Sequence, residues 1–486
     1  MKILIAASEM VPFAKTGGLA DMVGALSREL QGMGHEVTCI VPFYRSVAEA
    51  AGDARPTGVK ITVPVGVKQV SAEILETRMP DRRRVLFVRR DEYFDRSQLY
   101  RIPERDYEDN AERFIFFSKV VVSLSHTMNL QPDVIHCHDW QTALVPAFLR
   151  WASGRSGATG ATTKSQPRTV FTIHNLAYQG VFWGFDFPMT NLPGEYFTAD
   201  GLEFFGHLNC MKGGLVFSDV ITTVSRKYAE EIQTGIFGCG LESVLQKRRD
   251  RLFGILNGAD YAEWNPETDT RIAQRFSANN LAGKTACRRD LLKTFGLDEN
   301  YNGALVGIVS RLTDQKGFDL VADAATELCR RDMKLVVLGN GESNFEQMFR
   351  HFADQHPHQV AARIGFDDAL AHKIEAGADI FLMPSRFEPC GFSQMYSLKY
   401  GTIPIVRATG GLDDTVQNFD AATGQGNGFK FAKYESAAML AKLDEALGVF
   451  AQPKQWAQLQ RNAMVCDFSW RKAAQEYVAL YEKKLR

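Results

Sequence analysis

The sequence predicts an α/β fold of the doubly wound type that is divided into two domains, and three observations support this prediction. At 486 residues the chain is too long for a single hydrophobic core, because one domain holds roughly 100 to 200 residues. Short apolar runs typical of buried parallel strands alternate with segments whose apolar residues recur at helical spacing. The alternation occurs in both halves of the chain, so we expect two parallel sheets with helices on both faces.

The first half begins with an expected strand over residues 2–7, followed by a helix over residues 22–30 and a strand over residues 36–41. The run KTGG at residues 15–18 lies between the first strand and the helix. Gly17 and Gly18 let a ligand approach the backbone, the helix start offers unpaired N–H groups, and Lys15 adds a positive charge. This combination favours a phosphate-binding loop; a tight turn with a solvated lysine is the alternative interpretation.

Polar side chains follow the next two expected strands of this half. His136, His138, Asp139 and Trp140 come at the end of a strand that begins at residue 134, and His174 follows a strand over residues 169–173. The carboxyl ends of strands in open α/β sheets are where ligands bind, so we expect these residues at one site. Two histidines on one strand face could bind a metal, but no third ligand is near in sequence and no metal is expected.

Residues 91–112 are rich in tyrosine, arginine and aspartate. Exposed aromatic rings interleaved with hydrogen-bonding groups suit a sugar, which presents both C–H faces and hydroxyls, so Tyr93 and Phe94 are candidates for binding a sugar acceptor. The alternative is that these rings cap a core. A further segment, residues 152–165, is small and polar and is expected to form a flexible surface loop.

The second half carries a cationic loop with Arg311 and Lys316 after its first expected strand, residues 304–310. Arginine can bind two phosphate oxygens and lysine supplies a point charge, so the pair could stabilise a diphosphate leaving group without a metal. Helices are then expected over residues 319–330, 345–354, 369–376 and 391–400, and they alternate with strands expected over residues 334–338, 360–364, 379–383 and 402–407. A long amphipathic helix is expected over residues 470–485. A phosphate bound from both halves would imply a cleft between two domains.

Glu388 lies in a loop between an expected strand and an expected helix. We expect the positive end of that helix to stabilise its carboxylate, which could bind sugar hydroxyls or stabilise an oxocarbenium-like centre. A structural helix cap is the alternative. Downstream, Thr409, Gly410 and Gly411 form a second glycine loop, whose backbone is expected to be accessible to a ligand.

Composition excludes several classes of function. Lysine plus arginine total 56 and aspartate plus glutamate 57, so the net charge of -1 indicates neither a nucleic-acid partner nor an acidic membrane. Eight scattered cysteines without a C-x-x-C pair favour reduced thiols in a cytosol. There is no leader-like start and no apolar run of membrane-spanning length, so we expect a cytoplasmic protein. Whether it forms a homo-oligomer is left open.

Six motifs occur in an order that resembles bacterial glycogen synthases and plant starch synthases: KTGGLAD, HCHDWQTALVP, TIHNLAYQG, ILNGADYAEWNP, VSRLTDQKG and EPCGFSQMYSLKYGTIPIVRATGGL. The resemblance extends from residue 1 to the final helix. It implies the GT-B fold, in which two Rossmann-like domains face each other across a deep cleft. The domains would be residues 1–250, on the acceptor side, and residues 251–486, which bind the nucleotide sugar. The final helix, about 468–486, would pack back on the first domain.

The resemblance also implies an activity, namely transfer of glucose from ADP-glucose to the non-reducing end of an α-1,4-glucan, with retention and with neither cofactor nor metal. A starch synthase, or a UDP-glucose-using enzyme of the same fold, is the alternative. A sucrose-type or trehalose-type synthase fits less well, because KTGGLAD and HCHDWQTALVP argue against it. A phosphorylase would need a pyridoxal lysine, and a dinucleotide oxidoreductase a G-x-G-x-x-G turn. A non-catalytic glucan-binding protein would not need the intact cationic and acidic loops.

The resemblance assigns roles to single residues by position. The catalytic candidates are Glu388, Asp139, His174, Lys316 and Arg311. The candidates for binding ADP-glucose are Lys15, Gly17, Gly18, Asn257, Arg311, Lys316, Phe366, Glu388, Cys390, Gly391, Phe392 and Thr409. The candidates for binding the acceptor are Tyr93, Phe94, Asp139 and Trp140. Phe366 stands where relatives often have a tyrosine that stacks on adenine, so stacking is retained but a hydroxyl contact is lost.

Overall fold

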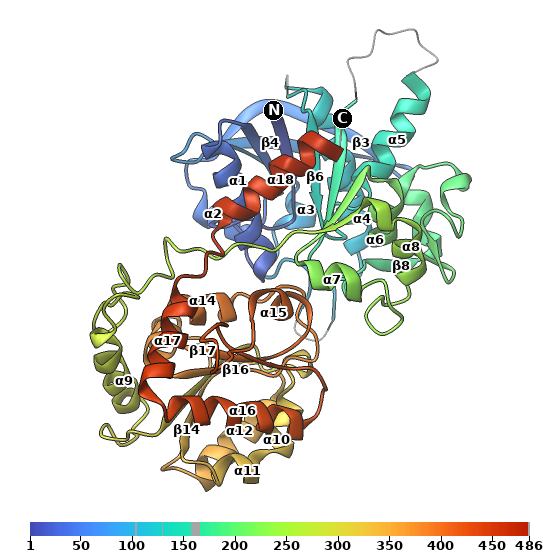
Figure 1. Cartoon of the computed structure of the whole chain (residues 1–486). Coiled ribbons are helices and arrows are strands. Elements are labelled where there is room, and N and C mark those ends of the chain that lie inside the picture. Colours follow the sequence, from blue (N-terminus) through green and yellow to red (C-terminus); the bar gives the residue numbers. More distant parts are fainter. Residues whose placement is uncertain (103–104, 129, 157–165, 485–486) are drawn as a thin grey trace. The chain divides into compact units, whose positions relative to one another are not determined.

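The computed structural model describes residues 1–102, 105–128, 130–156 and 166–484 (Figure 1). The chain forms two compact units. Unit 1 comprises Met1–Val224, Ala229–Asn257 and Trp470–Arg486, and unit 2 comprises Ser225–Tyr228 and Gly258–Ser469. Each unit contains a sheet with helices on both faces, and this sheet is mainly parallel in unit 1 and parallel throughout in unit 2. The predicted α/β class with two Rossmann-like units is therefore confirmed.

Unit 1 is built on a nine-stranded sheet with the order β12-β11-β7-β6-β1-β2-β5-β4-β3. Its strands are β1 (Lys2–Ala6), β2 (Glu36–Pro42), β3 (Arg55–Val65), β4 (Lys68–Arg78), β5 (Arg84–Arg89), β6 (Val134–His138), β7 (Arg168–Ile173), β11 (Val220–Thr223) and β12 (Leu252–Gly254). The strands from β12 to β5 are parallel, whereas β4 pairs antiparallel with both β5 and β3. All residues of β6 are buried, as expected for a strand covered on both faces.

Helices and short elements surround this sheet. The helices are α1 (Gly18–Gly32), α2 (Arg45–Ala50), α3 (Asp91–Phe94), α4 (Asn110–His126), α5 (Val145–Ser156), α6 (Cys210–Phe217), α7 (Arg226–Glu231), α8 (Glu242–Lys247) and α18 (Trp470–Lys484), and α7 begins in unit 2. A small sheet has the order β8-β10-β9, with β8 (Val181–Trp183), β9 (Glu203–Phe204) and β10 (His207–Asn209). The short 3-10 helices are η1 (Gly184–Thr190), η2 (Gly194–Tyr196) and η3 (Arg249–Arg251). Of the surface loop expected at residues 152–165, residues 152–156 continue α5, and residues 157–165 lie outside the described part.

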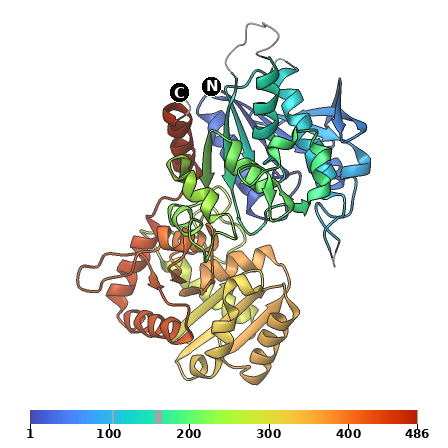
Figure 2. The same cartoon turned by 90° about the vertical axis from the view of Figure 1, so that its right-hand side faces the viewer.

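The C-terminal helix α18 belongs to unit 1, although it follows unit 2 directly in the sequence. It packs beside α1, as both views in Figures 1 and 2 show. Tyr477 and Tyr481 are buried on its inner face, and Arg471 pairs with Glu29 of α1 at 3.9 Å. Burial of aromatic side chains therefore attaches the end of the chain to unit 1.

Unit 2 contains a six-stranded sheet in which all neighbouring strands are parallel, with the order β15-β14-β13-β16-β17-β18. The strands are β13 (Ala304–Val309), β14 (Met333–Gly339), β15 (Val360–Ile364), β16 (Ile380–Met383), β17 (Ile403–Arg407) and β18 (Phe429–Phe431). The helical elements are α9 (Ala282–Thr294), η4 (Asp314–Lys316), α10 (Phe318–Asp323), α11 (Ala325–Cys329), α12 (Ser343–Gln355), α13 (Asp368–Gly377), α14 (Ser393–Lys399), α15 (Gly410–Thr415), α16 (Ser436–Phe450) and α17 (Pro453–Met464). The single helix expected over residues 319–330 is interrupted between α10 and α11.

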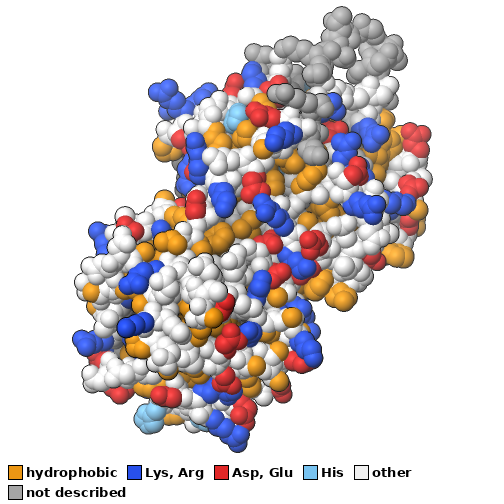
Figure 3. All heavy atoms as spheres, viewed as in Figure 1, with side chains coloured by type: hydrophobic (Ala, Val, Ile, Leu, Met, Phe, Trp, Pro, Cys, Tyr) orange, Lys and Arg blue, Asp and Glu red, His pale blue; other side chains and the backbone are white. Residues whose placement is uncertain are grey.

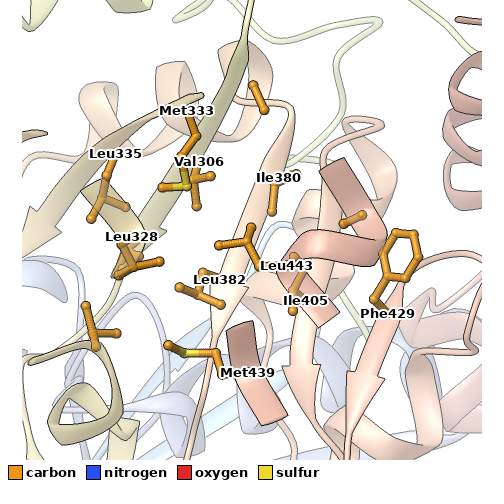
Figure 4. Packing of buried hydrophobic residues seen from close by; sticks show 14 of the residues in the cluster. Val306, Leu328, Met333, Leu335, Ile380, Leu382, Ile405, Phe429, Met439 and Leu443 are labelled. Carbon is orange, nitrogen blue, oxygen red and sulfur yellow. The ribbon is translucent and has the colours of Figure 1, made fainter. Parts of the chain in front are cut away.

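Alternating residues of β13 point to two different cores of unit 2. Val306 belongs to a cluster with α16, in which it lies near Leu382 and Leu443 (Figure 4). Leu305 belongs to a second cluster, with Ile374 of α13. Because successive side chains of a strand point to opposite faces, helices must cover both sides of the sheet.

The surface and the cysteines agree with the composition. Acidic and basic side chains are interspersed on the visible face of each unit (Figure 3). All eight cysteines are thiols rather than disulfides. Within the described ranges, no helix has the length and hydropathy needed to cross a membrane.

Candidate active site

The glycine loop of unit 1 connects β1 to α1. Gly17 is the residue before the first turn of α1, and it has no side chain that could cap the helix. Nζ of Lys15 lies 2.8 Å from Oδ1 of Asp21, and the lysine side chain is 54% exposed. The Lys15 ammonium group therefore lies at the surface, beside the start of the helix.

A residue that the sequence reasoning missed organises this loop. Glu9 is only 3% exposed, and its carboxylate accepts hydrogen bonds from the Thr16 backbone N–H at 2.5 Å, from the Thr16 hydroxyl at 2.6 Å and from Gly17 N–H at 3.4 Å. The Tyr100 hydroxyl also donates to it at 2.8 Å. The start of the helix was expected to offer unpaired N–H groups, but the amides of Thr16 and Gly17, which come directly before α1, are paired with Glu9. The sequence did contain a signal for this role, because Glu9 is the one charged residue in the apolar segment that follows β1. A carboxylate buried there needs hydrogen-bond donors.

Asp139 joins the ends of β6 and β7. It has a left-handed backbone with φ of 54°, and its Oδ1 accepts a hydrogen bond from the backbone N–H of His174 at 2.8 Å. Burial raises the pKa of Asp139 to about 7, although hydrogen bonds from the His174 and Asn175 amides oppose the shift. The two residues that were expected at one site from their strand ends are thus in direct contact.

The ring of His174 also makes a contact within this group. Its Nε2 lies 3.1 Å from Nδ1 of His138. Burial lowers the pKa of His174 to about 3, so the imidazole is neutral at neutral pH. A neutral histidine can donate a hydrogen bond to a ligand or accept one from it without carrying charge.

Two further candidates of unit 1 lie close to the ends of its strands. Trp140 packs against Gly180, where an added Cβ would overlap the indole ring. Asn257 follows β12 and is 3% exposed. Its Oδ1 has no hydrogen-bond partner among the residues that the structure describes, so the amide is available for a contact that a ligand could supply.

The expectation of an exposed sugar-binding surface at Tyr93 and Phe94 is wrong. Phe94 is fully buried and packs edge-on against Tyr44, while Tyr93 is 9% exposed and donates its hydroxyl to Glu112 at 2.5 Å. These rings cap the core of unit 1, the alternative that the sequence also allowed. A mixture of aromatic and charged residues cannot by itself distinguish a binding surface from a core with buried ion pairs and hydrogen bonds.

In unit 2, Lys316 and Glu388 form a buried ion pair. Nζ of Lys316 lies 2.5 Å from Oε2 of Glu388, and the two side chains are 16% and 8% exposed. The Ser385 hydroxyl donates to the same oxygen at 3.3 Å. The expected interaction of Glu388 with a helix start is wrong, because α14 begins only at Ser393; Lys316 supplies the positive charge instead.

Close contact between the loop after β13 and the loop after β16 explains why this pair forms. Gly317 has a φ of 75°, and a Cβ at this position would overlap the carbonyl oxygen of Pro384. The glycine therefore lets the loop after β13 contact the loop after β16. Arg386 N–H donates to the Gln315 carbonyl at 2.9 Å, which holds the two loops in register beside the ion pair.

The second glycine loop, residues 409–411, packs closely against the loop that contains Glu388. Gly410 and Gly411 are buried, and added Cβ atoms would overlap the carbonyl oxygens of Glu388 and Cys390. The expectation of an accessible backbone here is therefore wrong, and Thr409 is fully buried as well. The glycines bring the loop after β17 against the Glu388 loop and fix its path.

The rest of the Glu388 loop is also closely packed. Cys390 is 5% exposed, Gly391 has a left-handed φ of 75°, and the ring of Phe392 stacks on Tyr396. Gln394 donates to the Gly391 carbonyl at 3.0 Å. These contacts leave the loop little freedom to move the Glu388 carboxylate.

Two candidates of unit 2 are exposed at the same edge of the sheet. Arg311 follows β13 and is exposed, and Phe366 follows β15 and is 88% exposed. All strands of this sheet are parallel, so the residues after β13, β15 and β16 lie along one edge. An exposed ring, cations and a carboxylate at one sheet edge suit a base, a diphosphate and a sugar.

One group within the described ranges has the composition of a cation site. Glu263, Asp368 and His372 place potential ligand atoms within 4.8 Å of one another. However, the Arg271 guanidinium contacts both carboxylates at 3.1 Å, and Nδ1 of His372 contacts Asp269 at 2.7 Å. The carboxylates of the group are therefore engaged by Arg271, and the histidine by Asp269.

Two doubly wound units, a glycine loop in the first and a Lys–Glu pair at the sheet edge of the second define the class of this protein, a glycosyltransferase with the GT-B fold. The family model described as "Starch synthase catalytic domain" matches residues 2–247, and the model described as "Glycosyl transferases group 1" matches residues 293–463. The chain belongs to the glycogen and starch synthase family, which confirms the resemblance seen in the motifs.

Individual relatives support this assignment over the whole length of the chain. It is 49% identical to a protein named glycogen synthase from Koribacter versatilis, covering 99% of this chain and 98% of the relative. It is 46% identical to a glycogen synthase from Anaeromyxobacter sp., covering 99% of each. Among solved structures, the catalytic domain of starch synthase IV from Arabidopsis thaliana, bound to ADP and acarbose, is 32% identical, with a TM-score of 0.87 and 99% of each chain covered.

Proposed function

We propose that this protein transfers a glucosyl residue from ADP-glucose to the 4-hydroxyl at the non-reducing end of an α-1,4-glucan, with retention, and thereby elongates glycogen. The name glycogen synthase, which the bacterial relatives carry, supports glycogen as the product. The ADP and acarbose bound by the plant starch synthase support an ADP-linked donor and a glucan acceptor. The observation that carries the proposal is the buried Lys316–Glu388 pair, because it places a phosphate-binding cation directly beside a carboxylate.

In unit 2, the proposed donor contacts follow the order of the groups in a nucleotide sugar. The exposed Phe366 ring stacks on the adenine, while Arg311 and Lys316 bind the diphosphate. Glu388 faces the glucosyl group, and Cys390, Gly391, Phe392 and Thr409 shape the loops around it. Because Lys316 and Glu388 are in contact, the diphosphate and the glucosyl carbon would lie next to each other at this pair.

For the chemical step we propose departure and attack on the same face of the sugar. The bond from the anomeric carbon to the diphosphate oxygen breaks, the bond to the acceptor 4-oxygen forms, and the acceptor proton passes to the leaving diphosphate. Lys316 and Arg311 stabilise the negative charge that grows on the diphosphate. Glu388 stabilises the oxocarbenium-like centre, since none of the family motifs contains an evident nucleophile for the far face.

In unit 1, we assign acceptor contacts to Asp139, His174 and Trp140, and retain Lys15, Gly17, Gly18 and Asn257 as candidates for donor contacts. Asp139 and His174 are already linked by a hydrogen bond, so they would act on the substrate as one group. A cytoplasmic location is supported by the eight thiols. Homo-oligomerisation remains an open proposal.

The decisive experiment measures transfer of labelled glucose onto glycogen from ADP-glucose and from UDP-glucose, in the presence of EDTA. We expect transfer from ADP-glucose, α-1,4 linkages by NMR, and a severe loss of turnover with Glu388→Gln while ADP binding persists. Transfer from UDP-glucose alone would overturn the donor assignment, and loss of activity in EDTA would overturn the metal-free step. Trapping of a covalent glucosyl-enzyme would overturn the same-face mechanism.

A further inference from the structure

Three histidines lie at the ends of β6 and β7, and the proposed reaction uses only one of them. His136 and His138 are fully buried, with ring centroids 4.1 Å apart, whereas His174 is partly exposed. Nδ1 of His138 and Nε2 of His174 are joined by a hydrogen bond of 3.1 Å. The direction of this bond determines which nitrogen of His174 carries a proton, and therefore what His174 offers to a ligand.

All three imidazoles are neutral at neutral pH. Burial lowers the pKa values of His136 and His174 to about 3, and it lowers the pKa of His138 well below its usual range. Each ring therefore carries one proton, and two arrangements of the shared hydrogen bond are possible. Either His138 donates from Nδ1 to His174, or His174 donates from Nε2 to His138.

The environment of the second nitrogen of His138 distinguishes the two arrangements. Nε2 of His138 is buried and has no hydrogen-bond partner within the described ranges. If His174 were the donor, His138 would carry its proton on Nε2 as a buried N–H without an acceptor. If His138 is the donor, Nε2 holds only a lone pair, and an unpaired buried acceptor is less unfavourable than an unpaired buried N–H. The structure therefore favours donation from His138.

The neighbouring histidine limits the freedom of His138 to turn. His136 is held at both nitrogens, because Nε2 lies 2.6 Å from the Thr172 hydroxyl and Nδ1 lies 2.8 Å from the Tyr481 hydroxyl of α18. Its ring lies against that of His138. The His138 backbone N–H also donates to the Thr142 hydroxyl at 2.7 Å.

We propose that His138 is a positioning residue that keeps His174 in the Nδ1–H tautomer, so that His174 donates a hydrogen bond to an oxygen of the bound sugar. Asp139 accepts a hydrogen bond from the backbone N–H of His174. His138 and Asp139, which are adjacent in the sequence, therefore hold the ring and the backbone of His174, respectively. The identity of the ligand rests on the proposed function. The tautomer, in contrast, is a property of the enzyme without substrate, and it can be tested separately.

The first test needs no substitution that could disturb the fold. In protein labelled with ¹⁵N at its histidine rings, the ring nitrogen shifts distinguish a protonated nitrogen from one with a lone pair. The His174 signals are assigned by their loss in His174→Gln. We expect His174 to carry its proton on Nδ1 and His138 also on Nδ1. A proton on Nε2 of His174 would overturn the proposal, even if the enzyme transfers glucose as proposed.

The second test compares two amides at position 138. An asparagine amide reaches the place of histidine Nδ1, whereas a glutamine amide reaches that of Nε2. We expect His138→Asn to keep the His174 tautomer and most of kcat/KM for ADP-glucose. In His138→Gln we expect His174 to lose the Nδ1–H tautomer and kcat/KM to fall about tenfold. This decrease corresponds to the loss of one hydrogen bond. Equal losses in both variants with an unchanged tautomer would overturn the positioning role and leave only a packing role.

Discussion

Removal of the Lys316 charge should destabilise unit 2 more than removal of both members of its ion pair. Lys316→Met leaves the Glu388 carboxylate, which is 8% exposed, without its cation. Breaking a buried pair in this way costs about 3 kcal/mol or more. For a unit of this size, that loss lowers the Tm by about 6 to 12 °C. Glu388→Gln should reduce the free energy of unfolding by less than Lys316→Met does, because the Lys316 side chain is 16% exposed and its ammonium can be hydrated.

The assay is scanning calorimetry of the wild type, both single variants and the double variant. The double variant should recover most of the stability that Lys316→Met loses, because no uncompensated charge then remains in the site. A matched control is Lys442→Met, which breaks the more exposed Lys442–Glu445 pair at 2.6 Å and should change stability by less than about 1 kcal/mol. If Lys316→Met is as stable as the double variant, the reasoning about the buried charge is refuted.

The same variants separate stability from ligand binding. Both Lys316→Met and the double variant should lose affinity for ADP by about 10-fold to 100-fold, because each lacks the proposed phosphate ligand. Titration calorimetry measures this loss at a temperature where every variant is folded. Unchanged affinity for ADP would refute the role of Lys316, whatever its effect on the Tm.

Three further predictions concern single positions. Gly317→Ala should destabilise unit 2 by at least about 1 kcal/mol more than Gly296→Ala, as measured by calorimetry. Both glycines have a φ between 70 and 75°, but only Gly317 faces a backbone carbonyl. Phe366→Ala should leave the Tm unchanged, since the ring is 88% exposed. It should weaken ADP binding by about 10-fold or more in titration calorimetry. Equal affinities of the wild type and the variant for ADP would exclude stacking. The folded-state pKa of Asp139, about 7, exceeds its ordinary value of 3.8, so protonation favours folding. As pH rises from about 4 to 7, the wild type should therefore lose stability relative to Asp139→Asn, and a difference that is independent of pH would contradict the raised pKa.

Strand and helix positions could be predicted well in unit 2. The expected strand over residues 360–364 coincides with β15, and the strands expected at β13, β14, β16 and β17 differ from the observed ones by one residue at one or both ends. No strand was expected at β18. Fully buried parallel strands consist of continuous apolar runs, and their helices show a different period, so local pattern is informative. The interruption between α10 and α11 was not predicted, because both segments have apolar residues at helical spacing.

The candidate residues of the site could be found, but their partners could not. Glu388 and Lys316 were both singled out, yet they are 72 positions apart in the sequence, and only the contact between two loops makes them a pair. Glu9 was missed because two of its donors are the backbone amides of Thr16 and Gly17, which have no side-chain signature, and a third, the Tyr100 hydroxyl, is 91 positions away in the sequence. Tyr93 and Phe94 were expected at the surface, although the fold buries both.

The sequence by itself determined the family, the two α/β units and the placement of Asp139, His174, Lys316 and Glu388 after strands. These features depend on local apolar periodicity and on motifs that are contiguous in the chain. Only the tertiary structure decided which charges meet, which rings are buried, and that Tyr481 of the last helix reaches His136. Hydrogen bonds and ion pairs join atoms that the folding of distant segments brings together, and periodicity carries no information about them.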